Sequence, residues 1–383
     1  KKSLMNFGKK ENRLKKIMIR ILRFFLLLIM IVLAIVFTIN FPVASFSHNI
    51  SNNSYDSWMS ETLSGNQLIK DVAMLGAHDA FTSNMSIFSS VDELSAESIQ
   101  TGFTGFLIKG FSYRQSKTQV SDVTELLDKG VRYFDIRLTY NKDKSMWMTS
   151  HTYFSTPFID ILNDISDFLG NHPGEFLVLD IQHVNGVDYF DLSTFNEIKT
   201  LFDESGVLDY AYSEDSNAIK DITYSEITSN GTKAGVVILS KYEETDPLFY
   251  SYQSGIRSAW ANTDDQASLY TFINQEAADV SNHTTLTGNQ VSGNLNAIDA
   301  MDGFRVMQGV LTMQMSGSGI VSALMDWSLI QRAQNLNSSL IARTEFISWM
   351  SVLPIVMVDA ADTNKADFLD NIMQIIIEYN QNQ

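Results

Sequence analysis

Short apolar stretches alternate with longer amphipathic ones over most of this chain, and no other feature constrains the fold as strongly. Residues 158–169 show helical spacing, with apolar side chains on one side and acidic ones on the other. Strands are predicted at 72–75, 131–138, 176–181, 234–241, 304–313 and 354–359, and helices at 120–129, 158–169, 195–202, 341–350 and 366–379. Four strands end in a polar or charged residue. The pattern predicts an α/β fold with a closed, TIM-barrel-like (distorted parallel β/α) barrel.

An N-terminal segment, residues 1–45, is expected to lie outside this barrel. Residues 24–39 are uncharged and strongly apolar, and with their flanks they are long enough to span a bilayer. Basic residues precede this run, so we expect the N-terminus to stay cytoplasmic and the rest to be exported. A cleaved signal peptide, cut near Pro42-Val43-Ala44, is the alternative. The length of the run favours an uncleaved transmembrane anchor.

The remaining domain organisation follows from composition. Residues 46–65 are rich in Ser and Asn and are predicted to form a linker, and 66–383 to form the barrel. The polar stretch 246–303 yields only a short helix near 270–277. The protein is therefore expected on the extracellular face of the membrane, or secreted.

Charge and cysteine content exclude several classes of function. The net charge is −17, yet residues 1–23 carry +8, so the remainder carries −25. A body this acidic is a poor nucleic-acid binder, because nucleic acids require a basic face. The chain has no cysteine, which excludes disulfides and thiolate metal sites.

Polar residues at two strand ends indicate a chemical site. In 131–138 Asp135 and Arg137 should point to one face, and Phe134, Ile136 and Leu138 to the other. The next strand ends in His151, which can transfer protons near neutral pH. His78 and Asp79 follow the strand 72–75, at the end that carries chemistry in parallel barrels. The alternative is an ion pair of Arg137 or Arg132 that only locks the sheet.

These motifs resemble a known family. Leu75-Gly-Ala-His-Asp-Ala-Phe81, Gly130-Val-Arg-Tyr-Phe-Asp-Ile-Arg-Leu138, His151 and His172-Pro-Gly-Glu-Phe-Leu-Val-Leu179 are similar, in order and spacing, to the catalytic X region of bacterial-type phosphatidylinositol-specific phospholipase C. The resemblance covers roughly residues 71–379. It implies an enzyme that releases diacylglycerol and a cyclic inositol phosphate.

The resemblance also implies a role for each matching residue. His78 is similar to the general base that activates the inositol 2-hydroxyl, and His151 to the general acid for the leaving diacylglycerol oxygen. Arg137 is similar to the phosphate clamp, Asp79 to the partner of the acid histidine, and Asp359 to the carboxylate that orients His78. Two histidines can exchange base and acid roles, and a guanidinium matches phosphate oxygens.

No metal or other cofactor is expected. Calcium-requiring relatives carry acidic ligands where this chain has Arg137 and Gln182, and Ca²⁺ needs several oxygen ligands together. The predicted substrate-binding residues are Lys241, Gln182, His183 and Asp135. Two departures from the family stand out: Thr152 replaces the usual glycine after the second histidine, and Gln182-His183 stands where a lysine is expected.

The apolar stretch 102–111 is predicted to contact the lipid, as the corresponding part of the family does, through Phe103, Phe106, Leu107, Ile108 and Phe111. The alternative is that it caps the barrel core. The expected partners are a phospholipid membrane and its phosphatidylinositol-type lipids, with no nucleic acid and a monomeric protein. Two other functions stay open: a barrel phosphodiesterase acting on another glycerophosphodiester, and a surface binding module without catalysis.

Overall fold

A curled sheet of eight parallel strands forms the centre of the protein. The computed structural model describes residues 2–40, 50–186, 191–213, 219–241, 246–284, 296, 299–314 and 328–383. The strands, in chain order, are β1 (Met74–Ala77), β2 (Val131–Asn141), β5 (Phe176–Asn185), β6 (Gly235–Ser240), β7 (Phe249–Ser251), β8 (Ile256–Ser258), β9 (Phe304–Gly309) and β10 (Ile355–Val358). They run around the barrel in this order, and β10 pairs with β1.

The predicted parallel β/α barrel is confirmed, but the barrel is not closed. The hydrogen-bonded path begins at β7 and ends at β8, and these two strands are not paired in the described part of the chain. Each has only three residues, and the four-residue helix α9 (Tyr252–Gly255) joins them. Strands this short present few backbone groups for pairing. The structure therefore opens at one seam.

A hairpin extends from the barrel beside β2. Strands β3 (Met146–His151) and β4 (Tyr153–Pro157) pair with each other in antiparallel fashion, and β3 pairs with β2. His151 is the last residue of β3, as the sequence predicted. The hairpin thus brings the second histidine back toward the barrel.

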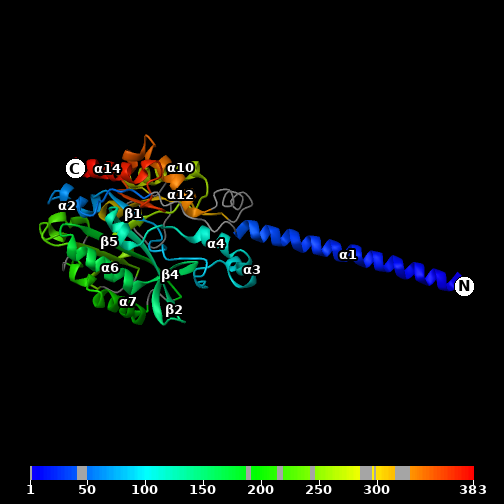
Figure 1. Cartoon of the computed structure of the whole chain (residues 1–383). Helices are drawn as coiled ribbons and strands as arrows, with labels where there is room; N and C mark the ends of the chain where they lie inside the picture. Colours follow the sequence, from blue (N-terminus) through cyan, green and yellow to red (C-terminus); the bar gives the residue numbers. More distant parts are fainter. Residues whose placement is uncertain are drawn as a thin grey trace.

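Helices cover the outside of the sheet (Figure 1). Strands such as β6 and β10 are buried along their whole length, as expected for parallel strands that pack on both faces. The remaining α-helices are α1 (Lys2–Asn40), α2 (Trp58–Thr62), α3 (Gly102–Leu107), α4 (Lys109–Ser116), α5 (Val123–Asp128), α6 (Phe158–Asn171), α7 (Leu192–Glu204), α8 (Tyr224–Ile227), α10 (Gln266–Ser281), α12 (Leu329–Ile341), α13 (Phe346–Met350) and α14 (Phe368–Gln381).

Three sequence predictions need correction. The helix predicted at 341–350 is the end of α12 followed by the separate helix α13. The stretch 246–303 holds β7, α9 and β8 besides a helix, α10, that is longer than predicted. The described part of the linker packs on the barrel, since Trp58 and Met59 lie in the main hydrophobic core.

Helix α1 projects away from the barrel and its apolar part contacts little else (Figure 1). Residues 13–40 include an 18-residue window of mean hydropathy 2.9 with none of it buried, so length and composition allow this helix to cross a membrane. The candidate cleavage site, 42–44, lies outside the described residues, as does the start of the predicted linker.

Candidate functional site

The carboxyl ends of β1 and β10 bring His78 and Asp359 together. These strands are parallel neighbours, and the backbone N–H of His78 donates to the carbonyl of Val358 (3.0 Å). The side chains follow directly, and His78 Nδ1 lies 2.7 Å from Asp359 Oδ1. When His78 is neutral, this bond fixes the proton on Nδ1 and leaves Nε2 free to accept another.

Arg137 lies beside this pair and is held by two buried carboxylates. Its Nε pairs with Asp79 Oδ1, and its Nη2 lies 3.5 Å from Asp135 Oδ2. Asp135 and Arg137 point to the same side of β2, as the alternation of a strand predicts, while Phe134 lies in the hydrophobic core. The Arg137 side chain as a whole keeps a quarter of its surface exposed, so it is not sealed from solvent.

His151, the last residue of β3, lies next to the carboxylate of Asp79. Its Nε2 lies 3.4 Å from Asp79 Oδ2, and its Nδ1 lies 2.7 Å from the carbonyl oxygen of Ser116. A carbonyl oxygen only accepts, so Nδ1 carries a proton and donates to it. Asp79 Oδ2 also lies 3.7 Å from His78 Nε2. One carboxylate therefore stands between the two imidazoles.

The charges around this site shift several pKa values. Burial lowers the pKa of His78, but the negative charges of Asp79 and Asp359 outweigh burial and raise this pKa to about 9. Burial raises the pKa of Asp79, but Arg137 and the neighbouring histidines hold it well below its usual range. Asp79 therefore stays ionised, and the site favours a proton on His78.

The contact between Arg137 and His78 disfavours a proton on His78 Nε2. Arg137 Nη2 lies 3.3 Å from His78 Nε2, and a guanidinium N–H can only donate. This contact is a hydrogen bond only when Nε2 lacks its proton. His78 thus meets both a charge that attracts a proton and a donor that competes with it, which suits a group that changes protonation state.

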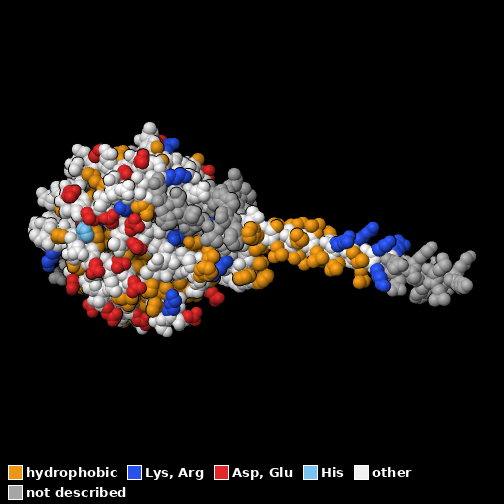
Figure 2. All heavy atoms as spheres, viewed as in Figure 1, with side chains coloured by type: hydrophobic (Ala, Val, Ile, Leu, Met, Phe, Trp, Pro, Cys, Tyr) orange, Lys and Arg blue, Asp and Glu red, His pale blue; other side chains and the backbone are white. Residues whose placement is uncertain are grey.

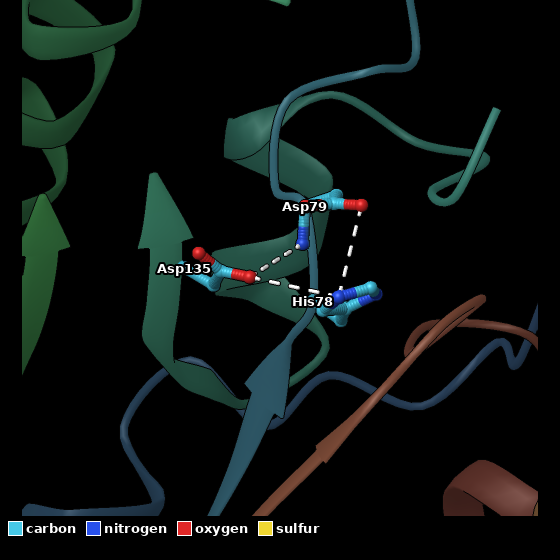
Figure 3. A group of neighbouring side chains, drawn as sticks. All are labelled: His78, Asp79 and Asp135. Atoms are coloured by element: carbon cyan, nitrogen blue, oxygen red, sulfur yellow. Dashed lines mark hydrogen bonds and ion pairs between the residues drawn. The ribbon is translucent and has the colours of Figure 1, made fainter. Parts of the chain in front are cut away.

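Three ligand atoms at the centre of the site could also hold a cation. Figure 3 shows His78, Asp79 and Asp135 facing one another, and one ligand atom from each lies within 4.8 Å of the others. The guanidinium of Arg137 already pairs with both carboxylates of this group. Its positive charge already neutralises these carboxylates, as a bound metal ion would.

A bulge in the pairing of β2 with β5 decides which predicted pocket residue faces the site. The register shifts after Ile136, so that Arg137 lies opposite His183 rather than Gln182. The pairing with Arg137 brings His183 beside the site. Burial and the nearby charges of Arg137 and Lys241 lower the pKa of His183 to about 4. Among the described residues, no hydrogen bond or ion pair joins the Gln182 side chain to this group.

Asp180, which the sequence analysis did not single out, interacts electrostatically with both Lys241 and Asp135. Lys241 lies over the ring of Tyr252, 4.6 Å from its centroid. Burial raises the pKa of Asp180 to about 8, helped by the charge of Asp135 and opposed by Lys241 and by a bond from Tyr133. An acidic residue inside the apolar strand 176–181 was the available signal. Asp135 has no exposed side-chain surface, so it supports Arg137 rather than reaching a ligand.

The segment after α4 ties the strand ends together and was also missed. Gln119 Nε2 donates to the carbonyls of His78 (2.8 Å) and Val358 (3.1 Å), and its Oε1 accepts from the N–H of Ala361 (3.1 Å). Thr118 Oγ1 donates to the carbonyl of Asp79 (2.8 Å). These bonds go to backbone atoms, which leave no trace in sequence spacing.

The predicted lipid-contact residues lie on α3 and at the start of α4. Phe103 and Phe106 are 75% and 73% exposed, which excludes them from the barrel core. Leu107, Ile108 and Phe111 are half-buried. Figure 2 shows hydrophobic side chains over α3, next to the end of α1. The exposed face is therefore an apolar surface beside the site.

Part of the sequence is similar to known proteins. Residues 106–267 match the family described as PI-PLC X 1. The chain is 34% identical over 159 residues to a variant-surface-glycoprotein phospholipase C of Trypanosoma brucei brucei, covering 39% of this chain and 42% of that protein. It is 31% identical over 149 residues to PI-PLC X domain-containing protein 3 of Danio rerio, covering 37% and 46%. The chain thus spans less than half the length of these relatives.

Solved structures of bacterial enzymes share the fold. The phosphatidylinositol-specific phospholipase C of Listeria monocytogenes superposes with a TM-score of 0.55 at 16% identity, covering 85% of this chain and 98% of that one. A variant of the Staphylococcus aureus enzyme gives 0.52 at 15% identity, covering 85% and 98%. Residues 106–267 are thus similar to PI-PLC X-domain proteins, and the chain shares its barrel fold with the bacterial phosphatidylinositol-specific phospholipases C.

Proposed function

We propose that this protein is a phospholipase C that cleaves phosphatidylinositol-type lipids to diacylglycerol and a cyclic inositol phosphate. The observation that carries this proposal is the arrangement of two imidazoles around Asp79, at 3.7 Å from His78 Nε2 and 3.4 Å from His151 Nε2. Arg137 pairs with the same carboxylate. An anion bound at Arg137 would lie within reach of a base and an acid.

The reaction uses the two histidines in opposite directions. His78, neutral at Nε2, takes the proton of the inositol 2-hydroxyl, and that oxygen forms a bond to phosphorus. The bond from phosphorus to the diacylglycerol oxygen breaks, and His151, protonated at Nε2, supplies a proton to that oxygen. The substrate provides its own nucleophile, so no covalent enzyme intermediate forms. Asp359 keeps the proton of His78 on Nδ1 and directs Nε2 to the hydroxyl.

Arg137 binds the phosphate in this proposal. A guanidinium can offer two parallel N–H donors to two phosphate oxygens, and it stabilises the charge that develops on them. Asp79 and Asp135 fix its position. The cation needed for phosphoryl transfer is thus part of the chain, and we propose that no metal is required.

The inositol ring would lie toward β5 and β6. His183, with its lowered pKa, is neutral at pH 7 and can donate to one hydroxyl and accept from another. Lys241 supplies a cation on the same side. Phe103 and Phe106 would contact the lipid at the mouth of the site, on the extracellular face of the membrane.

The test of this function compares substrates that differ in one atom. A short-chain, water-soluble phosphatidylinositol should be cleaved, and its 2-deoxyinositol analogue should not, because it lacks the attacking oxygen. Equal cleavage of both would support a water-activating phosphodiesterase on other glycerophosphodiesters. No cleavage of either, with retained binding, would support a binding module.

A further inference from the structure

The last turn of α1 is bonded to α4 at the rim of the barrel (Figure 1). Asn40 Nδ2 donates to the carbonyl of Leu107 (2.7 Å), and Asn40 Oδ1 accepts from the N–H of Gly110 (2.6 Å). Arg114 Nη2 donates to the carbonyl of Ile39 (2.6 Å). A helix ends with carbonyls that lack partners within the helix. Here the buried Arg114 of α4 donates to two of them, the carbonyls of Ile39 and Asn40.

The two helices approach so closely at Gly110 that no side chain fits there. A Cβ atom at this position would lie 2.8 Å from the carbonyl oxygen of Asn40 and 2.9 Å from its Oδ1. Gly110 is the second residue of α4, and glycine is a poorer helix former than alanine. The close contact with α1 gives a reason for its presence. The end of α1 and the face of α4 are therefore shaped for each other.

The same short helix leads to the catalytic site. Ser116, the last residue of α4, accepts the bond from His151 Nδ1 (2.7 Å). Eight residues of helix span about 12 Å, so the end of α1 and the acid histidine are one short helix apart. The exposed rings of Phe103 and Phe106 lie on α3, which directly precedes α4. Anchor, apolar rim and site are thus joined by one continuous segment, residues 102–116.

The described part of α1 has the properties of a membrane span. Residues 13–40 would be about 42 Å long as a helix, which exceeds the roughly 30 Å of a hydrocarbon core. None of its most apolar window is buried against the barrel. The acidic barrel gains nothing from attraction to anionic lipid, so contact with a bilayer needs another source.

We propose that α1 is retained, and that its docking on α4 holds the apolar rim and the site against the outer leaflet of the same bilayer that α1 crosses. The proposed partner surface is this leaflet, and the enzyme acts on lipids of its own membrane. The choice of lipid substrate rests on the proposed function, whereas the orientation does not. The acidic barrel is not attracted to anionic lipids, so the docked helix α1 holds it at the membrane instead.

The orientation can be measured in the full chain reconstituted into liposomes. Because the protein has no cysteine, a single introduced cysteine labels one position. Thr104→Cys on α3 should place its fluorophore within reach of a lipid-borne quencher. Ser348→Cys on α13, which precedes β10 and so lies at the opposite end of the barrel, should leave its fluorophore unquenched.

Two variants break the docking without touching the site. Gly110→Leu fills the space next to Asn40. Asn40→Ala removes the two hydrogen bonds that join Asn40 to Leu107 and Gly110, together with one to Val36 within α1. Each should reduce quenching at position 104 and lower cleavage of phosphatidylinositol in the same liposomes by about tenfold, the size expected for losing such bonds. Cleavage of a soluble substrate should be unchanged. Thr38→Ala is the matched control, because among the described residues the Thr38 hydroxyl bonds only to the carbonyl of Ala34, within α1.

Three results would decide against the proposal. Unchanged quenching and unchanged cleavage in both docking variants would show that the contact does not set the orientation. Recovery of the native protein without residues 1–40 would show that α1 is removed. Equal quenching at positions 104 and 348 would show a free barrel. If lipid cleavage is absent but quenching depends on docking, the orientation stands and the proposed function fails.

Discussion

His78 Nδ1 and Asp359 Oδ1 lie 2.7 Å apart at the ends of two paired parallel strands, with both side chains almost fully buried. This bond determines which nitrogen of His78 can meet a substrate. It also contributes to the raised pKa of His78, about 9, through the charge of the carboxylate and the bond itself. The first prediction follows from removing that charge.

Asp359→Asn should move the pH dependence of catalysis to lower pH. A general base works only when deprotonated, so kcat/KM should rise with pH until the pKa of His78 is passed. The carboxylate favours the protonated imidazole, and its loss should lower the pKa of His78 by about one unit or more. The rising limb of kcat/KM against pH, measured on a soluble inositol phosphodiester, should shift accordingly, with a lower maximum. An unshifted limb would mean that His78 is not the titrating base.

His78→Ala and His151→Ala should each lower kcat by about 10²–10⁴-fold, because each removes a proton-transfer group. Thermal unfolding should change little, since both side chains retain some exposure at the rim of the site. His172→Ala is the control, because its Nδ1 contacts Phe168 in α6, away from the site. Near-normal turnover in either variant would remove that histidine from the mechanism.

Thr152→Gly should stabilise the protein by about 1 kcal/mol. Thr152 has φ +68°, a conformation that costs a β-branched residue on the order of 1–3 kcal/mol. Glycine relieves this strain but loses about 0.5–1 kcal/mol to chain entropy. The bonds from Thr152 N to Ser95 Oγ (3.0 Å) and from Asp92 N to Thr152 O (2.8 Å) use only its backbone. Chemical denaturation measures the change, and a clear loss of stability would show that the threonine side chain holds the loop.

Phe106→Ser combined with Leu107→Ser should weaken vesicle binding and leave hydrolysis of a soluble substrate intact. Burying two such side chains in lipid contributes roughly 3–6 kcal/mol. Leu192→Ser on α7 is the control, since Leu192 is also exposed and apolar. Vesicle co-sedimentation measures the binding. Loss of thermal stability together with soluble activity would instead place the segment in the core.

The sequence predicted which polar residues follow β1 and β10, because the physical rule is local, although several strand ends differ by two to four residues from those predicted. An apolar strand that terminates in His78, Asp79 or Asp359 must present those residues at one end of a parallel sheet. The helix α6 was predicted for the same reason, since its apolar face repeats at helical spacing. Both inferences need only neighbouring residues.

Features that depend on distant contacts were not predictable in this way. The bulge that turns His183 rather than Gln182 toward Arg137 arises from pairing between two strands. Gln119 donates to the backbone carbonyls of His78 and Val358. These carbonyls are present whatever side chains the two positions carry. The polar stretch before Gly65 resembled a linker, yet the buried Trp58 fixes it to the barrel.

The proposed mechanism can be tested by phosphorus NMR of phosphatidylinositol cleavage in the presence of EDTA. A cyclic inositol phosphodiester should appear first, at a rate that chelation leaves unchanged, because His78 and His151 transfer the protons and Arg137 supplies the cation. An acyclic phosphate as the first product, or activity lost with EDTA and restored by Ca²⁺, would contradict it.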